Sequence, residues 1–251
     1  DISTKHIYQG IDSLDGNATS EFSFRSTGEG IEYDGVLNVA SGTVVLKDLI
    51  EGFHRLDGDV VLDLKFQGGA SGGSFQGDAV VSRGRLKAGK LLKGIESIEG
   101  DARLEISFSG GSGLTPSYNG TLSLSEALFS ASDVIDGVKS LVGKARSTIR
   151  LESRSDGAVS LKGTVDLSSA SFAADRIYPG IRELSGNGAA HLSFERIPDG
   201  SVSFEGKVLI MKGILGLEAV SELLDNIVAE IDFDGESVDI KGMTGDFGRS
   251  R

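Results

Sequence analysis

The chain has 251 residues, of which 39% are hydrophobic and 25% charged, a balance typical of a folded domain rather than a disordered segment. It contains no cysteine, which excludes disulfides and cysteine chemistry, and its net charge of −12 argues against binding to nucleic acid. No apolar run approaches the roughly 18 residues that a membrane-spanning helix needs.

A glycine motif recurs along the chain. Five segments fit G-Φ-x-x-Φ-x-G, in which Φ is apolar, and their second glycines lie 42 or 43 residues apart. This first glycine series is Gly16, Gly58, Gly100, Gly143 and Gly186. A second glycine series with the same interval is Gly35, Gly77, Gly120, Gly163 and Gly206. Two series in one phase indicate a structural repeat.

The repeat divides the chain into units of one repeat domain, 1–251. We place the units at 16–57, 58–99, 100–142, 143–185, 186–224 and, in part, 225–251. The chain begins at Asp1 and ends at Arg251 within a unit, so we expect it to be a fragment of a longer protein.

Each unit is predicted to hold three strands and a connector. After the first glycine, apolar and polar residues alternate strictly, as in Ala102-Arg-Leu104-Glu-Ile106, which predicts a strand with one apolar face. The second glycine lies inside the next alternating run, where a bulge, a sharp coil of the sheet or a close approach of another backbone is expected. A third, short strand follows, for example at 84–88 and 170–174.

The connectors carry a different spacing of apolar residues. Val134, Ile135, Val138 and Leu141 are spaced i, i+1, i+4 and i+7, which is the stripe of a helix. Because Pro179 and Gly180 interrupt one copy, we expect a turn or two of helix, or a packed loop, in each connector. The segment 216–230 is the most strongly helical of them.

Two architectures fit units of this length. The first, which we favour, is an all-β fold with short helical connectors, in which an elongated, twisted antiparallel sheet folds lengthwise into a taco-like apolar groove. The second is a β-propeller, whose blades have about 40–45 residues. A propeller blade needs four strands and often carries Trp-Asp, whereas this chain has no tryptophan.

These patterns resemble the AsmA-like superfamily, which includes the AsmA and TamB-type proteins of diderm bacteria. The resemblance rests on the Φ-x-G-x-Φ-x-Φ-x-Φ strand starts, the runs with an interior glycine, and connectors such as Ile177-Tyr-Pro-Gly-Ile-Arg-Glu-Leu-Ser-Gly186. It covers the chain from about Gly10 to Gly242. The regular 42–43-residue spacing departs from that family.

The resemblance implies a non-enzymatic conduit or binding groove for phospholipid or another acyl-chain lipid, serving outer-membrane biogenesis. It also implies a periplasmic location, an inner-membrane anchor outside this chain and a possible outer-membrane protein partner. No cofactor is implied.

The candidate lining of the groove consists of apolar residues that share one strand parity. Burying a CH₂ group contributes about 0.8 kcal/mol, so an apolar floor can hold a lipid without polar contacts. The lining residues are Val60, Leu62, Leu64, Phe66, Leu104, Ile106, Phe108, Leu122, Leu124, Ile149, Leu151, Leu192, Phe194, Val208, Ile210, Ile231 and Phe233. The alternative is that they pack against one another as a closed core.

Catalytic and metal-binding patterns are not found. The segment 69–73 matches G-x-S-x-G around Ser71, but it lies between two predicted strands, which favours a hairpin loop over a nucleophile elbow. His6, His54 and His191 have no ligand spacing, and the Asp-Gly pairs are typical of turns. We therefore expect no catalytic, cofactor or metal site. The rival function is a secreted or surface β-repeat scaffold that binds protein or carbohydrate through its loops.

Overall fold

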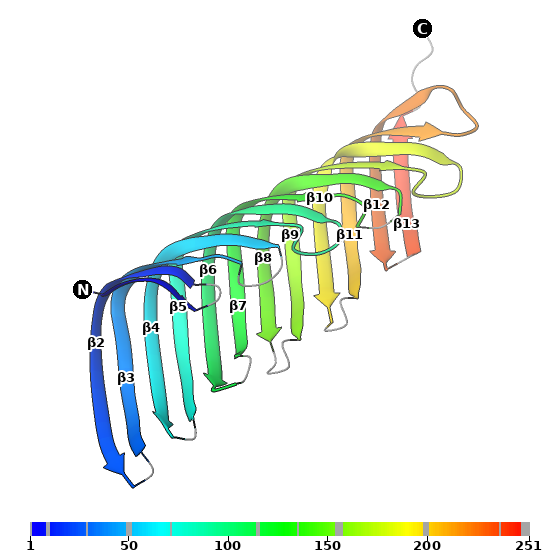
Figure 1. Cartoon of the computed structure of the whole chain (residues 1–251). Coiled ribbons are helices and arrows are strands. Elements are labelled where there is room, and N and C mark those ends of the chain that lie inside the picture. The colour runs from blue at the N-terminus through cyan, green and yellow to red at the C-terminus, as the bar shows by residue number, and fades with distance from the viewer. Residues whose placement is uncertain are drawn as a thin grey trace.

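The computed structural model shows an all-β fold in which the strands form one open, twisted antiparallel sheet (Figure 1). It describes residues 2–8, 11–28, 30–48, 52–70, 72–113, 116–134, 136–153, 158–197, 201–235 and 237–246, of which 2–8 are described by their backbone alone. The strands are β1 (Ile2–Tyr8), β2 (Ile11–Thr27), β3 (Gly30–Leu46), β4 (Phe53–Gly69), β5 (Gly72–Gly89), β6 (Ile95–Gly111), β7 (Ser117–Ala131), β8 (Val138–Ser153), β9 (Val159–Asp175), β10 (Ile181–Arg196), β11 (Val202–Leu217), β12 (Leu223–Asp234) and β13 (Ser237–Asp246).

Each strand pairs with its neighbours in the sequence, so the sheet is a meander in the order β1 to β13. The described strands do not close into a ring, which excludes the propeller and confirms the elongated antiparallel sheet. The described residues contain no helix that could cross a membrane.

The sheet is folded lengthwise, because every long strand bends partway along its length (Figure 1). In β5, for example, the pairing with β6 shifts between Val81 and Gly84, and Arg83 has a φ of 49°. This bulge separates a long arm, Gly72–Val81, from a short arm, Gly84–Gly89. In the other long strands, too, we call the part on one side of the bulge, toward the same edge as Gly72, the long arm, and the remaining part the short arm.

The prediction of three strands per unit is therefore wrong. The segments 84–88 and 170–174 are the short arms of β5 and β9, continuous with the long arms through the bulge. Each interval of 42 or 43 residues holds two long strands instead. The alternation changes phase at the bulge, which is why one bent strand reads as two.

The prediction of helical connectors is also wrong for the described residues, which contain no helix. The segment 216–230 consists of the end of β11, a turn at 218–222 and the start of β12. In β8 a register shift lies between Val138 and Ser140, so Val138 and Leu141 are both buried although they are three residues apart. Buried residues in a regular strand are two positions apart in the sequence. A bulge makes them three apart, which is the spacing typical of a helix. Ile135 lies outside the described residues.

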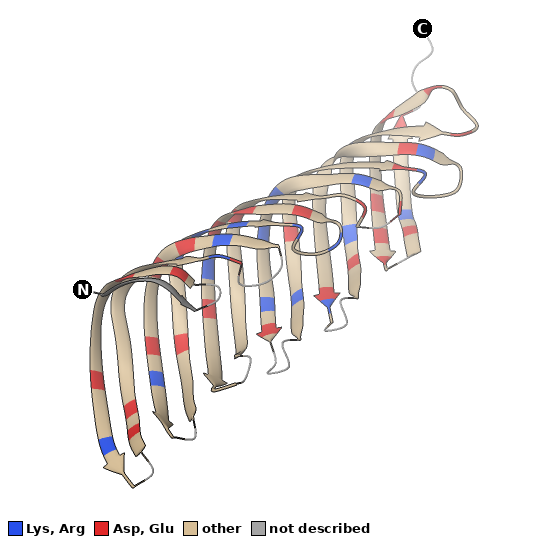
Figure 2. Cartoon of the chain, in the orientation of Figure 1, with Lys and Arg blue, Asp and Glu red and all other residues tan. Residues whose placement is uncertain are grey.

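One face of the sheet, the inner face, carries the hydrophobic core. Apolar side chains of the long and short arms form a single buried cluster, from Leu14 in β2 to Phe233 in β12. The polar residues of the alternating pattern lie on the opposite, outer face. Lys, Arg, Asp and Glu are spread along the strands with both signs mixed (Figure 2).

The first glycine series lies at the bend. A Cβ atom on Gly58 would come 2.8 Å from the Cα of Gly84, and one on Gly100 would come 2.4 Å from the Cα of Ala127. Such contacts are too short for any side chain, so the glycines let neighbouring strands approach closely where the sheet folds over.

The second glycine series occupies equivalent places in β3, β5, β7, β9 and β11, as the repeat predicts. Rings of the following strand lie over most of these glycines. A Cβ atom on Gly163 would come 2.7 Å from the ring of Phe194, and one on Gly206 would come 2.6 Å from that of Phe233. The expected close approach is therefore made by side chains, together with a backbone carbonyl, rather than by backbone alone.

Candidate functional site

The inner face of the long arms is the candidate site, and cross-strand pairing places its predicted residues side by side. Leu64 pairs with Gly77, which pairs with Phe108, and Leu62 is joined to Ile106 through Ala79 in the same way. Leu62, Leu64, Phe66, Leu104, Ile106 and Phe108 therefore share one face, as the alternation predicts.

The predicted lining residues fall into two groups by burial. Twelve of them are buried in the core, namely Val60, Leu104, Leu122, Leu124, Ile149, Leu151, Leu192, Phe194, Val208, Ile210, Ile231 and Phe233. The other five, Leu62, Leu64, Phe66, Ile106 and Phe108, are half-buried. All five lie in β4 and β6, in the N-terminal half of the sheet.

Residues at the same position of the repeat differ in exposure from one unit of the sheet to the next. Phe24, Phe66, Phe108, Leu151 and Phe194 occupy one such position, 42 or 43 residues apart. Phe24 is 74% exposed, Phe66 and Phe108 are half-buried, and Leu151 and Phe194 are 2% and 3% exposed. Near the hairpin ends of the long arms, the inner face is thus open over β2–β7, which we call the open stretch, and filled over β8–β12, the closed stretch. Deeper inner-face residues such as Leu104 and Leu122 are buried in the core.

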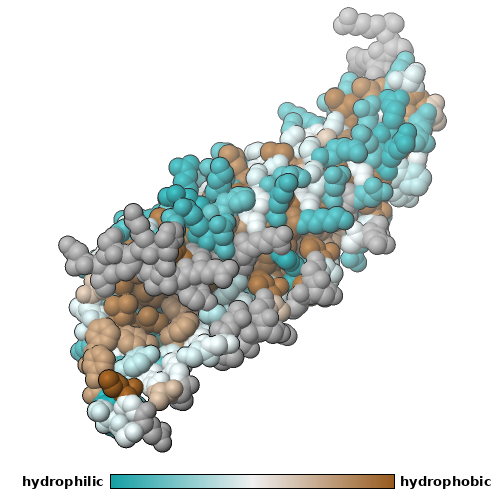
Figure 3. All heavy atoms as spheres, viewed as in Figure 1, coloured by the Kyte–Doolittle hydropathy of each residue, from teal (hydrophilic) through white to brown (hydrophobic). Residues whose placement is uncertain are grey.

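A second repeat position shows the same gradient. Two residues before the glycines of the second series stand Tyr33, Phe75, Tyr118, Leu161 and Phe204. Tyr33 is 40% exposed, Phe75 and Tyr118 are half-buried, and Leu161 is fully buried. Apolar atoms are visible at the N-terminal end of the molecule in Figure 3.

Aromatic rings line the open stretch. The ring centroids of Phe22 and Phe66 are 5.4 Å apart, and those of Phe75 and Phe108 are 6.3 Å apart. A cavity of about 350 Å³ lies near the hairpin loops between Tyr33, Phe66 and Phe75. The open stretch therefore presents a continuous apolar and aromatic surface.

Several residues of this surface were missed in the sequence, namely Phe22, Phe24, Ile31, Tyr33, Phe75 and Tyr118. The signal that could have found Tyr33, Phe75 and Tyr118 is their common place two residues before a glycine of the second series. Phe22 and Phe24 are at the repeat positions of Leu64 and Phe66.

Tyr118 and Ser153 form a polar pair where the open stretch meets the closed stretch. They are cross-strand partners in β7 and β8, and their side chains are hydrogen-bonded. Burial raises the pKa of Tyr118, while the hydrogen bond with Ser153 acts in the opposite direction. Ser153 is buried, and so is Ser147, whose hydroxyl donates to the carbonyl of Thr164 at 2.8 Å.

The outer face of the long arms is polar and slightly hollowed. A cavity of about 750 Å³ over β3–β8 is lined mostly by outer-face residues such as Asn38, Asp63 and Asn119, and its lining also includes the inner-face residues Phe108 and Tyr118. A second, of about 430 Å³, lies over β8–β11 beside Lys162. We call these two cavities together the outer hollow.

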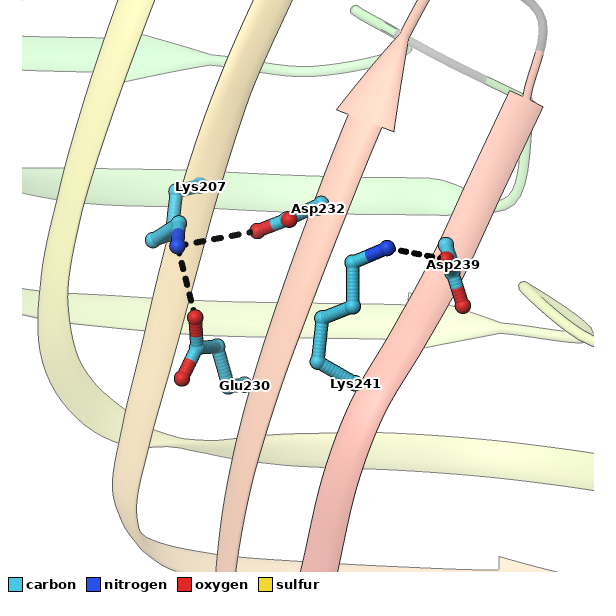
Figure 4. Close-up of polar contacts among 5 residues, drawn as sticks. All are labelled: Lys207, Glu230, Asp232, Asp239 and Lys241. Carbon is cyan, nitrogen blue, oxygen red and sulfur yellow. Dashed lines mark hydrogen bonds and ion pairs between the residues drawn. The ribbon is translucent and has the colours of Figure 1, made fainter.

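Ion pairs cross the outer face at its C-terminal end (Figure 4). Lys207 Nζ lies 2.6 Å from Glu230 Oε1 and 3.5 Å from Asp232 Oδ1, and Lys241 pairs with Asp239. The hydrogen bond to Glu230 and then the charge of Asp232 raise the pKa of Lys207. Lys207 and Lys241 are exposed, whereas Glu230 and Asp232 are half-buried. Ion pairs at the surface such as these contribute little to stability.

No grouping suited to a metal or a nucleophile appears in the described part of the chain. No cluster of three or more His, Asp or Glu residues there could hold a metal ion. His191 pairs with Asp166 at 2.6 Å on the exposed outer face, and His54 is exposed in β4. Ser71 lies outside the described residues, but Gly69 and Gly72 on either side of it are paired ends of β4 and β5, as a hairpin requires.

Comparisons of the chain with protein-family models, with curated proteins and with solved structures find no match.

Proposed function

We propose that the protein binds acyl chains of lipids on its inner face and performs no catalysis. The observation that carries this proposal is the open stretch itself, in which large apolar side chains such as Phe24 and Phe66 face solvent on a face that is buried elsewhere. Contiguous exposed apolar surface of this kind is typical of a binding site.

The energetics favour an extended apolar ligand. Each buried CH₂ group contributes about 0.8 kcal/mol, so a single acyl chain gains affinity along its whole length without any specific polar contact. The strands are bent lengthwise, so the inner face is curved rather than flat (Figure 1). A lipid head group can remain in water at the exposed edge of the inner face.

The biological role follows from the resemblance of the repeat to the AsmA-like superfamily. We propose that the chain supplies a lipid-binding groove for phospholipid transport between the inner and outer membranes, located in the periplasm and attached to the inner membrane. An outer-membrane protein partner belongs to the same proposal.

A second candidate function is an interaction scaffold, and the outer hollow favours it. Its hydroxyl, amide and charged side chains, such as Ser107, Asn119 and Lys162, suit a polar ligand such as carbohydrate or a polar protein surface. The two functions use opposite faces of the same strands, so variants on the two faces separate them.

The test is displacement of a fluorescent fatty acid from the purified protein and two variants. Ile106→Asp places a carboxylate in the open stretch, whereas Thr148→Asp places one on the exposed outer face. We expect saturable binding by the wild type, at least ten-fold weaker binding by Ile106→Asp and unchanged binding by Thr148→Asp. Circular dichroism verifies that both variants are folded. No binding at micromolar protein, or equal loss in both variants, would contradict the proposal.

A further inference from the structure

We infer that the open stretch is a blind-ended site for one acyl chain, closed at β8 by Leu151 and Ser153, so that affinity depends on chain length up to a limit. This inference rests on the proposed function and adds to it a ligand size and an end point. In a continuous conduit, by contrast, a chain of any length would find the same surface.

The end point follows from the rows of side chains that run across the strands. One row passes from Leu64 through Gly77, Phe108 and Tyr118 to Ser153. Its first four residues are half-buried, and Ser153 is buried. The exposed apolar surface in this row therefore ends between β7 and β8.

The adjacent row becomes buried one strand earlier, at β7. It runs from Ala79 through Ile106 and Gly120 to Leu151 and Leu161. Ala79 and Ile106 are half-buried, whereas Gly120 is buried, Leu151 is 2% exposed and Leu161 is fully buried. A chain that follows either row meets side chains already packed in the core, and in the first row it also meets the Tyr118–Ser153 hydrogen bond.

The length of the open stretch fits one chain of an ordinary membrane lipid. Six strands, β2–β7, enclose five intervals of about 4.8 Å, or roughly 24 Å. The hydrocarbon core of a bilayer is about 30 Å thick, so a chain in one leaflet spans about 15 Å. The stretch is thus long enough for a whole chain but not for two placed end to end.

The test measures the affinities of straight-chain saturated fatty acids of increasing length, each by displacement of the same fluorescent probe. For the wild type we expect about four-fold tighter binding per added CH₂, the factor that corresponds to 0.8 kcal/mol, up to a length beyond which affinity stays constant. Continued tightening across the whole series would overturn the blind end while leaving acyl-chain binding intact. Failure of every fatty acid to bind would overturn the proposed function together with this inference.

Matched variants locate the site within the stretch. Ala79→Phe fills its middle, since Ala79 is half-buried between Leu62 and Ile106, and it should move the limit to shorter chains. Val80→Phe, on the outer face between Val61 and Glu105, should leave the limit unchanged. Leu64→Ala removes a floor contact without blocking the groove, so it should weaken binding but keep the limit. An equal loss for all chain lengths in Ala79→Phe would contradict the inference, and thermal melts show whether each variant is folded.

Discussion

Glycine in this protein is a packing residue more than a turn residue. The glycines of the second series lie inside long strands, where a glycine ordinarily weakens a sheet. Here a ring from the following strand covers the glycine, as Phe66 covers Gly35 and Phe108 covers Gly77. The ring gains buried area that a β-carbon would block, which explains the glycine in four of the five units; at Gly120 the close contacts are instead with Glu105 and Ile106 of the preceding strand.

Gly163→Ala should destabilise the protein by about 1–3 kcal/mol, the usual cost of overpacking. The new Cβ atom would lie 2.7 Å from the ring of Phe194 and 2.8 Å from the carbonyl oxygen of Thr148. Gly242→Ala in β13 is the control, because nothing lies within 4 Å of its Cβ position. Urea unfolding curves measure both, and equal midpoints in the two variants would show that the Phe194 ring does not require the glycine.

At the scale of the element, the bulge is what converts a flat meander into a folded sheet. Arg83, Glu126 and Ser169 have φ values of 49°, 52° and 52°, and they stand 43 residues apart in β5, β7 and β9. A left-handed conformation costs a non-glycine residue roughly 1–2 kcal/mol. The repeat tolerates this strain because the bulge brings both arms of each strand onto one core.

Glu126→Gly should therefore stabilise the protein by roughly 1 kcal/mol, since glycine adopts the left-handed conformation without strain. In the same strand, Ser123→Gly should destabilise it by about 0.5–1 kcal/mol, because Ser123 is an exposed residue of regular strand. Thermal melts show whether each variant is more or less stable than the wild type. Destabilisation by both substitutions would show that the bulge at Glu126 is not strained.

The strands were predictable from the sequence, but the bulges and the connectors were not. Alternation of apolar and polar residues, as in Leu104 to Phe108, correctly gave the strands and the face that each residue takes. Ile95 and Ile98 are both buried at the start of β6, although they are three residues apart, because the register shifts between Ile95 and Ser97. Such spacing cannot be distinguished from a helical stripe without knowledge of the strand pairing.

At the scale of the whole molecule, the sheet is a linear array in which each strand is hydrogen-bonded to its neighbours in sequence. Stability in such arrays is close to a sum of terms for units and for their interfaces. The same repeat position can therefore have different surroundings in different units. This is how one sequence pattern produces an open stretch at β2–β7 and a closed stretch at β8–β12.

Two substitutions by aspartate at the same repeat position should lower the free energy of unfolding by very different amounts. Ile149→Asp buries an unpaired carboxylate in the closed stretch, where Ile149 is fully buried, and should cost several kcal/mol. Ile106→Asp, 43 residues earlier, leaves its carboxylate within reach of water and should cost markedly less. Thr148→Asp serves as the outer-face control. Chemical unfolding measures the three, and equal losses at the two isoleucines would indicate a core that is closed throughout.

Destabilisation at one end of the array should remain local. Ile231→Asp in β12 places a charge at a buried position and should remove amide protection from β11–β13, while the amides of β4–β6 stay protected. Leu209→Asp on the exposed outer face of β11 is the control and should leave protection unchanged. Hydrogen exchange followed by mass spectrometry resolves the strands. Uniform loss of protection across the sheet would show all-or-none unfolding instead.

For the candidate site, the sequence predicted which residues share the inner face but not which of them are exposed. Alternation assigns Phe66 and Phe194 to the same face and the same repeat position, yet Phe66 is half-buried and Phe194 is 3% exposed. Exposure depends on how completely the opposing arm and the neighbouring units cover each residue. Those contacts arise from the packing of the whole sheet, so no local pattern encodes them.

Photo-crosslinking with a fatty acid that carries a diazirine near its methyl end tests the central claim most directly. After irradiation and digestion, mass spectrometry identifies the labelled peptides. Binding of an acyl chain in the open stretch predicts label on inner-face residues of β3–β7, such as Leu64 and Phe108, and none on the closed stretch around Phe194. Label on outer-face residues such as Asn119 and Lys162, or label spread evenly from β3 to β12, would contradict it.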